Sequence, residues 1–91
     1  MGIEFDEAKN QKNIAKHAIS FVEVEYFDFI SARIEIDDRK NYGEIRYVAL
    51  GYLYGRLHVL CYVEVVSGIR VISLRKANLR ESKKYEKERI H

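Results

Sequence analysis

The chain has 91 residues, with 16 basic and 14 acidic side chains and a formal net charge of +2. We expect one domain, residues 1–91, with a single small core and no room for a deep cofactor cavity. No apolar run approaches the roughly 20 residues that cross a bilayer, and the N-terminus has no secretory-signal pattern. The single cysteine excludes an internal disulfide. These features predict a cytoplasmic protein that does not associate with membranes.

Charge is distributed unevenly along the chain. Residues 1–45 carry six basic and ten acidic side chains, whereas residues 46–91 carry ten basic and four acidic ones. A polyanion would therefore be attracted to the second half. The acidic stretch 23–38 either faces a basic partner or is simply solvated.

The N-terminal segment predicts a short edge strand over 3–5, followed by a helix over 7–16. Asp6 is a suitable N-cap for this helix. One helix face gathers polar side chains at spacings of three and four residues: Lys9, Lys12, Asn13 and Lys16. This face either points to solvent or follows an RNA backbone.

A second helix is predicted over 21–29, after a tight connector at 17–19. Ser20 and Glu23 have the spacing of a capping box, in which the Ser20 hydroxyl accepts from the Glu23 amide and the Glu23 carboxylate accepts from the Ser20 amide. The residues that follow are mostly apolar. We expect this helix to supply the core layer against a sheet.

Alternating residues and glycine-containing turns predict strands over 32–37, 44–52, 56–65 and 69–75, with antiparallel hairpins. Residues 38–43 are expected to form a polar loop. A second capping signal, Asn78 to Glu81, opens a charged C-terminal helix. The predicted fold class is α+β: two N-terminal helices packed on a small antiparallel sheet of three to four strands, plus the C-terminal helix.

Strand parity predicts which side chains share a face of the sheet. The simplest assembly buries one set under the second helix: Tyr47, Val59, Cys61 and Val71. Cys61 is then a buried core thiol, with a reactive nucleophile as the alternative. The other face carries a second set: Arg46, Tyr62, Glu64 and Arg70.

Motifs spread over nearly the whole chain occur in a characteristic order. The first half contains Ile3-Glu4-Phe5-Asp6, Lys9, Asn13, Lys16-His17, Ile19-Ser20-Phe21 and Glu23. The second half contains Arg46, Gly51, Gly55-Arg56-Leu57, Tyr62, Ile69-Arg70-Val71-Ile72-Ser73, Arg75, Ala77, Arg80-Glu81 and Tyr85. This order and spacing resemble the BrnT family of toxins, ribonucleases of type II toxin–antitoxin systems. The resemblance implies a RelE-like fold, an RNA substrate and a hetero-oligomer with a ribbon-helix-helix, BrnA-like antitoxin.

The chain departs from the family pattern at several positions. Ala18 stands where the family has glycine, so the connector is expected to avoid a positive φ. Phe5 replaces a tryptophan. Val63 and Val65 replace a threonine and an arginine, and the missing arginine removes one phosphate donor.

A ribonuclease of this kind can use the RNA 2′-hydroxyl as its nucleophile without a metal. A base accepts the hydroxyl proton, an acid protonates the leaving 5′-oxygen, and cations hold the charge of the phosphorane. Arginine suits the last task because its planar fork donates two parallel hydrogen bonds to phosphate oxygens. The predicted catalytic residues are Arg46, Glu64, Arg70, Arg75 and His17, with Glu64 or His17 as the base.

A further group of residues is predicted to bind RNA: Lys9, Lys12, Lys16, Arg56, Tyr62 and Arg80. Tyr62 is expected to stack on a base or to act as a weak acid. His58 is expected to be an exposed strand residue. Neither a metal nor a nucleotide cofactor is expected, because no residue cluster has metal-ligand spacing and no glycine-rich phosphate loop occurs.

Structural roles remain open for three of the predicted catalytic residues. His17 can be a helix-terminal residue, Glu64 an ion-pair partner of Arg70, and Arg75 a bridge to the final helix. The main hypothesis is an endoribonuclease toxin that inhibits translation and growth and is neutralised by its antitoxin. The alternative is a non-catalytic RNA-binding or protein-partner-binding module, which would bind RNA in a salt-sensitive way and cleave none.

Overall fold

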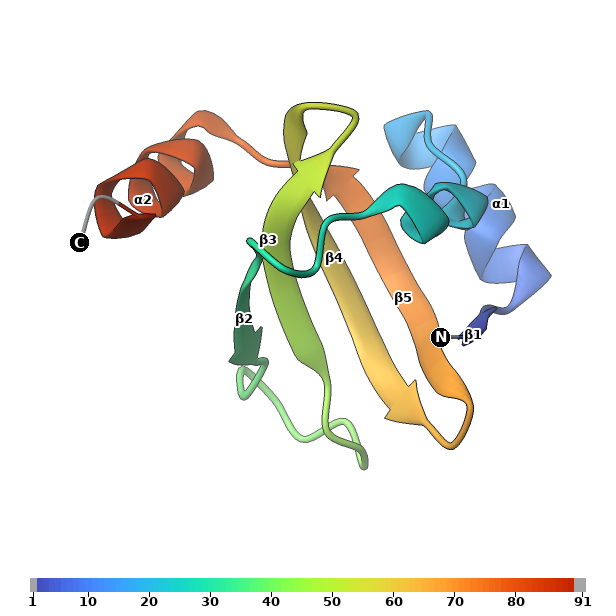
Figure 1. The fold of residues 1–91 in the computed structure, drawn as a ribbon. Coiled ribbons are helices and arrows are strands. Elements are labelled where there is room, and N and C mark those ends of the chain that lie inside the picture. Colours follow the sequence, from blue (N-terminus) through green and yellow to red (C-terminus); the bar gives the residue numbers. More distant parts are fainter. Residues whose placement is uncertain (1, 90–91) are drawn as a thin grey trace.

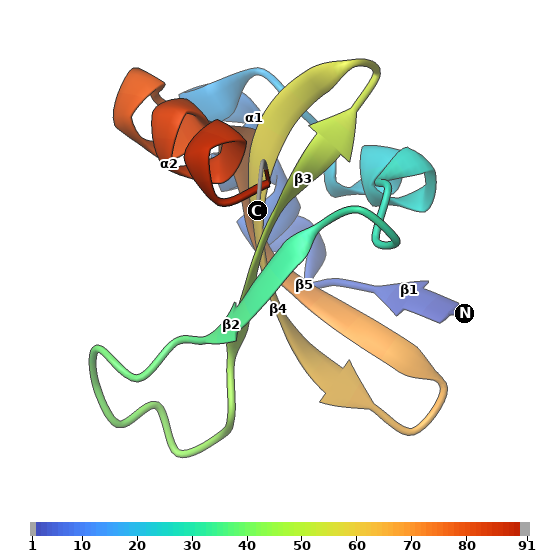
Figure 2. The same ribbon diagram turned by 60° about the vertical axis from the view of Figure 1, so that its left-hand side comes forward.

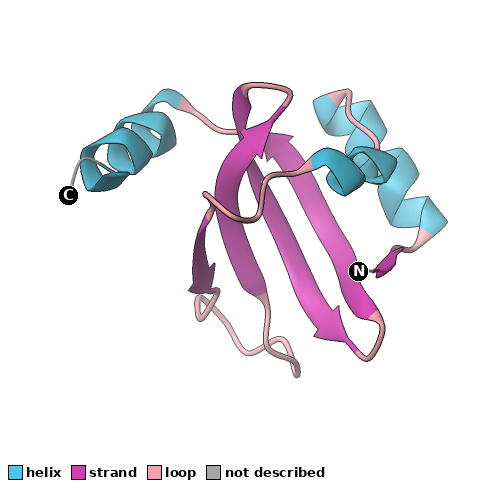
Figure 3. Ribbon diagram, in the orientation of Figure 1, coloured by secondary structure: helices cyan, strands magenta, loops and turns pink. Residues whose placement is uncertain are grey.

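The computed structural model describes residues 2–89 as a five-stranded mixed sheet with helices at both ends of the chain (Figure 1). The strand order across the sheet is β1-β5-β4-β3-β2. The elements are β1 Gly2–Glu4, α1 Glu7–His17, the 3₁₀ helix η1 Phe21–Tyr26, β2 Arg33–Ile36, β3 Tyr47–Leu53, β4 Arg56–Val65, β5 Gly68–Lys76 and α2 Leu79–Arg89. Figure 3 distinguishes helices from strands by colour. No helix in this described part is long and apolar enough to span a membrane.

The predicted architecture is wrong in two respects, although the α+β class is retained. Residues 21–29 do not form a second α-helix, because only Phe21–Tyr26 is helical and it is a 3₁₀ helix. β-Branched and aromatic side chains, which lower α-helix propensity, dominate this segment. The sheet has five strands rather than three to four, and it is mixed because β1 pairs with β5 in parallel.

Short turns set the two long hairpins as predicted. Tyr54 and Gly55, between β3 and β4, have φ angles of 52° and 75°. Positive φ at both central residues is what a type I′ hairpin turn requires. The β3–β4 and β4–β5 pairs are both antiparallel.

A β-bulge in β5 changes which side chains share a face. Cys61 pairs with Ser73 and Tyr62 pairs with Val71, so Ile72 has no partner on β4. An extra residue of this kind inverts the parity of the strand beyond it. The sequence-based parity of β5 is therefore wrong after Ile72.

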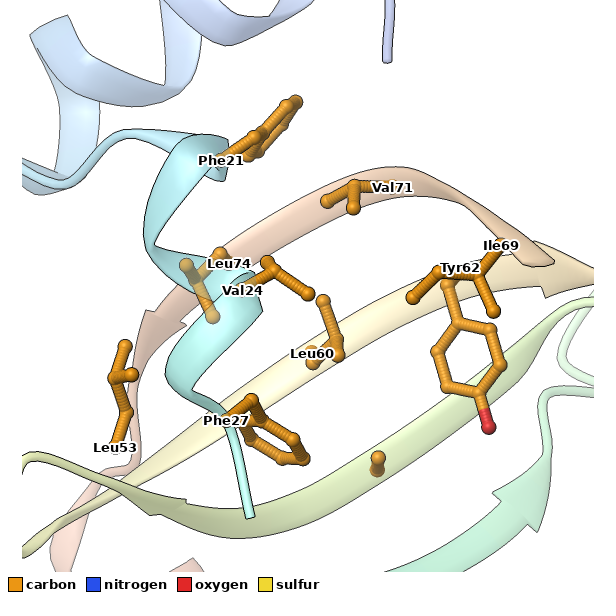
Figure 4. Packing of buried hydrophobic residues seen from close by; sticks show 10 residues of the cluster. Phe21, Val24, Phe27, Leu53, Leu60, Tyr62, Ile69, Val71 and Leu74 are labelled. Atoms are coloured by element: carbon orange, nitrogen blue, oxygen red, sulfur yellow. The ribbon is translucent and has the colours of Figure 1, made fainter. Parts of the chain in front are cut away.

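The larger core lies between the sheet and the N-terminal helices, and we call this side the helix-side face. Figure 4 shows Phe21, Val24 and Phe27 over the strand residues Leu60 and Leu74. The ring of Phe27 also covers Gly51, where an added Cβ atom would lie 2.8 Å from the ring. Only a residue without a side chain allows this close approach.

We call the opposite side of the sheet the open face. The predicted assignment of β4 to the two faces is wrong: Leu60 and Tyr62 lie in the helix-side core, whereas Val59 and Cys61 lie on the open face. Residues 57–63 are all buried. Because both sides of β4 are covered, the apolar parity of this strand does not reveal which side faces α1.

Two buried asparagines attach α1 and η1 to the core. Asn13 Nδ2 donates to the Leu74 carbonyl at 2.8 Å, and its Oδ1 accepts from the Leu74 amide at 3.2 Å. Asn10 Oδ1 accepts from the Phe21 amide at 2.8 Å. Asn13 therefore serves as a hydrogen-bonding partner for β5 and does not belong to the exposed lysine face predicted for this helix.

The ends of α1 are set by Asp6 and Ala18. The predicted N-cap is confirmed, since Asp6 accepts from the Lys9 amide at 3.0 Å. Ala18 ends the helix with φ of 59° and donates to the Ile14 carbonyl at 2.8 Å. The expectation that Ala18 avoids a positive φ is wrong, because this left-handed residue closes the helix.

The two predicted capping boxes have different outcomes. Ser20 caps η1 by accepting from the Val22 amide at 3.2 Å, and the Glu23 carboxylate accepts instead from the Tyr54 hydroxyl at 2.6 Å. The first box is therefore wrong in its partners. The second is confirmed, because Asn78 and Glu81 accept from each other's amides at 2.8 and 2.9 Å.

A smaller core attaches α2 to the open face. Tyr85 packs with Leu57, Val59 and Ala77, and its hydroxyl donates to the Ser31 carbonyl at 2.7 Å. Figure 2 shows α2 near one end of the sheet and the long β2–β3 connection at the other. α2 thus covers part of the open face and leaves the rest accessible.

Candidate functional site

A groove of about 440 Å³ lies on the open face, between the start of α2 and the segment 37–46 that links β2 to β3. We call it the arginine groove. Its floor consists of strand side chains, namely Val48, Val59, Cys61, Ile72 and Ser73. Its polar lining includes Glu35, Asp37, Asp38, Arg39, Tyr42, Arg46, Arg75 and Glu81. Three guanidinium groups therefore line one concave surface: Arg39 and Arg46 come from the segment 37–46, and Arg75 comes from β5.

The bulge in β5 and the cap of α2 position Arg75. Because of the bulge, Arg75 pairs with Val59 and shares the open face with it. The two terminal guanidinium nitrogens of Arg75 each donate to a Glu81 carboxylate oxygen at 2.8 Å. These hydrogen bonds lower the pKa of Glu81 and raise that of Arg75. The bridge from Arg75 to the final helix, left open by the sequence, is thus present.

Asp37 organises the segment 37–46. Its side chain is 2% exposed and accepts from Arg39 Nε at 2.8 Å. It also accepts from a terminal nitrogen of Arg39 at 2.9 Å and from the Tyr42 hydroxyl at 3.1 Å. The hydrogen bond from Arg39 is the main reason that the pKa of Asp37 lies well below its usual range. The carboxylate therefore stays charged and holds two side chains of the loop.

Arg46 enters the groove from the residue just before β3. Its guanidinium group lies over the Tyr42 ring, 4.0 Å from the ring centroid. Its Nε donates to Glu44 at 3.4 Å, and its side chain is 22% exposed. A cation over an aromatic face is attracted by the negative quadrupole of the ring, so Tyr42 stabilises this position of Arg46.

Three guanidinium groups and four carboxylates line the groove, so its positive charges are balanced by neighbouring acidic side chains. Arg39 pairs with Asp37, Arg46 with Glu44 and Arg75 with Glu81. The two non-bridging oxygens of a phosphodiester can accept two hydrogen bonds from one guanidinium group, as the two oxygens of a carboxylate do. The arrangement can therefore bind a polyanion by exchanging a carboxylate partner for a phosphate.

Arg70 lies on the open face but outside the arginine groove. It pairs across the sheet with Val63 and with Glu4, and its Nε donates to Glu4 at 3.0 Å. It lines a separate pocket with Tyr47 and Glu64. The predicted convergence of arginines is thus only partly correct, because Arg46 and Arg75 share a groove and Arg70 does not.

Glu64 lies near Tyr47 and does not pair with Arg70. The predicted ion pair between Glu64 and Arg70 is wrong, because Arg70 pairs with Glu4. The nearby Glu64 carboxylate is the main reason that the pKa of Tyr47 is raised. Glu64 therefore lies near the first residue of β3, away from the arginine groove.

Two residues expected at the surface are buried. Tyr62 is 7% exposed, and its ring stacks on Tyr47 at 5.5 Å and meets Phe29 edge-on at 6.0 Å. In this position Tyr62 does not offer a face to an RNA base. His58 is 4% exposed, and burial lowers its pKa. Both expectations are wrong for the same reason, which is the burial of both sides of β4.

His17 is the last residue of α1 and does not line the arginine groove. Burial is the main cause of its lowered pKa, followed by the positive charges of Lys16 and Arg75. The helix that carries His17 packs against β5, the strand that carries Arg75.

Cys61 lies on the floor of the groove and is 8% exposed. Burial raises the pKa of its thiol. The prediction of a buried thiol is confirmed, although Cys61 faces the open side of the sheet. A raised pKa disfavours the nucleophilic thiolate.

The other predicted RNA-binding residues are all exposed: Lys9, Lys12, Lys16, Arg56 and Arg80. None of them lines the arginine groove. The three lysines are on α1, which packs mainly against β5. They can contact RNA only if the strand extends well beyond the groove.

Sequence reasoning missed Asp37, Arg39 and Tyr42, which the fold brings into the groove. These residues lie in or beside a segment that was interpreted only as a polar loop. The one signal available was the combination of basic and aromatic side chains there, a composition that favours contact with nucleic acid.

Guanidinium groups therefore lie over an open sheet face of this small α+β fold. Residues 5–81 match the family model described as "Ribonuclease toxin, BrnT, of type II toxin-antitoxin system". The chain therefore belongs to the BrnT family of ribonuclease toxins, which implies an RNA substrate and an antitoxin partner. No curated protein matches the chain.

Proposed function

We propose that this protein is an endoribonuclease toxin that cleaves RNA without a metal ion, inhibits translation and growth, and is neutralised by a ribbon-helix-helix antitoxin. The arginine groove is the observation that best supports this proposal. Its lining residues lie within the matched range 5–81, and three of them are arginines. Because the chain belongs to a ribonuclease toxin family, RNA is the polyanion that we expect this groove to bind.

In the proposed mechanism, Arg46 and Arg75 bind the non-bridging oxygens of the scissile phosphate. Each exchanges its carboxylate partner, Glu44 or Glu81, for the phosphate. Negative charge on these oxygens grows as the 2′-hydroxyl loses its proton to the base and attacks phosphorus, so guanidinium groups already in place lower the barrier. The bond to the 5′-oxygen then breaks, leaving a 2′,3′-cyclic phosphate, and the 5′-oxygen takes a proton from the protonated base or from water. Arg70, on the same face of the sheet, binds an adjacent phosphate.

The proposed base is His17 or Glu64. The lowered pKa of His17 keeps its imidazole neutral near pH 7, which is the form that accepts a proton. Neither residue lines the groove, so the base must reach the 2′-hydroxyl from outside it. Substitution of each residue distinguishes the two candidates. The variant that lacks the base loses the ascending limb of the pH–rate profile of kcat/KM, and the other variant keeps it.

The central experiment measures RNA cleavage by the purified protein in the presence of EDTA. We expect wild-type activity to persist, and Arg46→Ala and Arg75→Ala each to lower kcat on the order of 10²–10³-fold. Arg89→Ala is the matched control, since it removes a guanidinium group of α2 that does not line the groove. Equal cleavage by all four proteins would reject the proposed site.

The antitoxin is tested in cells. Expression of the wild-type chain should arrest growth, and co-expression of a ribbon-helix-helix protein encoded beside it should relieve the arrest. Arg46→Ala should permit growth and still co-purify with that protein. Salt-sensitive RNA binding without cleavage, under every condition tried, would favour the non-catalytic module instead.

A further inference from the structure

We infer that Asp37 and Tyr42 are positioning residues for Arg46: the Asp37 carboxylate fixes the Tyr42 phenol, and the Tyr42 ring holds the Arg46 guanidinium group at the arginine groove. The functional part of this inference rests on the proposed role of Arg46 in phosphate binding. The contacts among Asp37, Tyr42 and Arg46 do not depend on that role, so the contacts and the function are tested separately.

A continuous chain of contacts runs from the buried carboxylate to the arginine. Asp37 Oδ2 accepts from the Tyr42 hydroxyl at 3.1 Å. The Tyr42 ring then lies under the Arg46 guanidinium group, whose central carbon is 4.0 Å from the ring centroid. The Asp37 side chain is 2% exposed, so this series of contacts begins at a buried carboxylate.

The backbone of Asp37 also closes the segment at its base. The Asp37 amide donates to the Arg46 carbonyl at 2.8 Å, which brings the two ends of the segment 37–46 together. Tyr42 lies near the middle of that segment, and Asp37 draws its side chain back toward Arg46. The backbone hydrogen bond and the side-chain contacts thus support the same arrangement.

Arg46 needs such support more than Arg75 does. Arg75 is fixed by two hydrogen bonds of 2.8 Å to Glu81. Arg46 precedes the first residue of β3, and its hydrogen bond to Glu44 is longer, at 3.4 Å. When a phosphate displaces Glu44, the Tyr42 ring is the contact that remains. A guanidinium group held before the substrate arrives loses less entropy on binding and is better placed for the transition state.

Two substitutions at Tyr42 test separately its hydrogen bond to Asp37 and its ring contact with Arg46. Tyr42→Phe removes the hydrogen bond to Asp37 and keeps the ring, whereas Tyr42→Leu removes the ring as well. Tyr54→Phe is the matched control. It also removes a tyrosine hydroxyl that donates to a carboxylate, here Glu23 at 2.6 Å, but Tyr54 does not line the groove. We expect kcat to fall about two- to tenfold in Tyr42→Phe and about 10- to 100-fold in Tyr42→Leu. Tyr54→Phe should retain wild-type kcat.

A double-mutant cycle shows whether Tyr42 acts through Arg46. Arg46→Lys keeps the charge and loses the planar group that stacks on the ring. If the inference is correct, Tyr42→Leu lowers kcat in the wild-type background and has little further effect in Arg46→Lys. A loss that is the same in both backgrounds overturns the positioning role and leaves only a structural one.

A readout independent of activity completes the test. The Nε–H proton resonance of Arg46 should be shifted by the ring current of Tyr42, and this shift should disappear in Tyr42→Leu. Absence of the shift in the wild-type protein overturns the inference whether or not RNA is cleaved. If the shift is present and Arg46→Ala cleaves RNA as well as wild type does, the contact stands and the proposed function of Arg46 fails.

Discussion

The Arg75 guanidinium group and the Glu81 carboxylate are joined by two hydrogen bonds of 2.8 Å, which connect β5 to the first turn of α2 at the edge of the arginine groove. Glu81 at the same time accepts from the Asn78 amide at 2.9 Å and so caps its own helix. The Glu81 carboxylate therefore stabilises the C-terminal helix and also pairs with Arg75, a proposed phosphate-binding residue. This double role leads to the first prediction.

Glu81→Gln should bind RNA more tightly than wild type. A neutral amide competes less well for Arg75 than a carboxylate does, so we expect the Kd for RNA to fall about two- to fivefold. Stability should change by at most about 1 kcal/mol, because glutamine still accepts from the Asn78 amide. RNA affinity is measured by fluorescence anisotropy at fixed salt concentration.

Glu86→Gln provides the control for this experiment. It removes one negative charge from the same helix, where Glu86 accepts from the Tyr52 hydroxyl outside the groove. An equal gain in RNA affinity from both substitutions would show that net charge, and not release of Arg75, is responsible.

Stability should decrease in acid because of Asp37 and Glu81. Both have a folded-state pKa below the ordinary value, Asp37 mainly through Arg39 and Glu81 mainly through Arg75. The unfolded chain then binds more protons than the folded one at low pH. The stabilisation is complete above the unfolded-state pKa values of about 4 and is lost as the pH falls through the folded-state values.

Asp37→Asn tests this pH dependence. At pH 7 we expect it to lower the free energy of unfolding by about 1–3 kcal/mol, because hydrogen bonds to a buried charge are lost. Its stability should also depend less on pH between pH 4 and pH 2 than that of wild type. Urea unfolding over this range is the measurement, and an unchanged pH dependence would contradict the assignment of Asp37.

Ala18→Gly should stabilise the protein. Ala18 has φ of 59°, a conformation that glycine adopts without the Cβ penalty of alanine. We expect a gain of about 0.5–1 kcal/mol, which corresponds to a rise in Tm of about 2–8 °C for a domain of this size. Thermal unfolding followed by circular dichroism measures it.

The matched control is Ala15→Gly, in the same helix and also exposed. Here glycine should destabilise the protein by about 0.5–1 kcal/mol, because the position is helical. A decrease in Tm for both substitutions would show that the left-handed conformation of Ala18 carries no measurable strain.

Asn13→Ala should destabilise the protein strongly. It would leave the amide and the carbonyl of Leu74 without their side-chain partner in a buried region. We expect a loss of about 2–4 kcal/mol, since each buried polar group without a partner costs about 1–3 kcal/mol. Lys12→Ala, one residue away and exposed, should change stability by less than about 0.5 kcal/mol. Similar urea midpoints for the two variants would argue against the bridge.

Local features of the fold were predictable because their causes lie within a few residues. The Asp6 cap, the box of Asn78 and Glu81, and the turn at Tyr54 and Gly55 all depend on neighbouring backbone groups. The box at Ser20 was wrong since a distant group, the Tyr54 hydroxyl, took the Glu23 carboxylate. Where a long-range contact competes with a local one, the local pattern does not reveal the outcome.

The candidate site was predictable only in part. Arg46 and Arg75 were identified as arginines suited to hold the charge of a phosphate, and both line the groove. Asp37, Arg39 and Tyr42 were missed, because their grouping depends on how the segment between β2 and β3 folds back over the sheet. A polar loop looks the same in sequence whether it extends into solvent or closes on itself.

The sequence by itself determined the family, the α+β class, the hairpins and most helix caps, because these follow from motif order and from contacts between near neighbours. Only the tertiary structure decided which side of β4 faces α1, since residues 57–63 are buried on both sides. It also decided that Arg70 and Arg75 share the open face. Strict alternation would separate them, and the single unpaired residue Ile72 brings them to the same side.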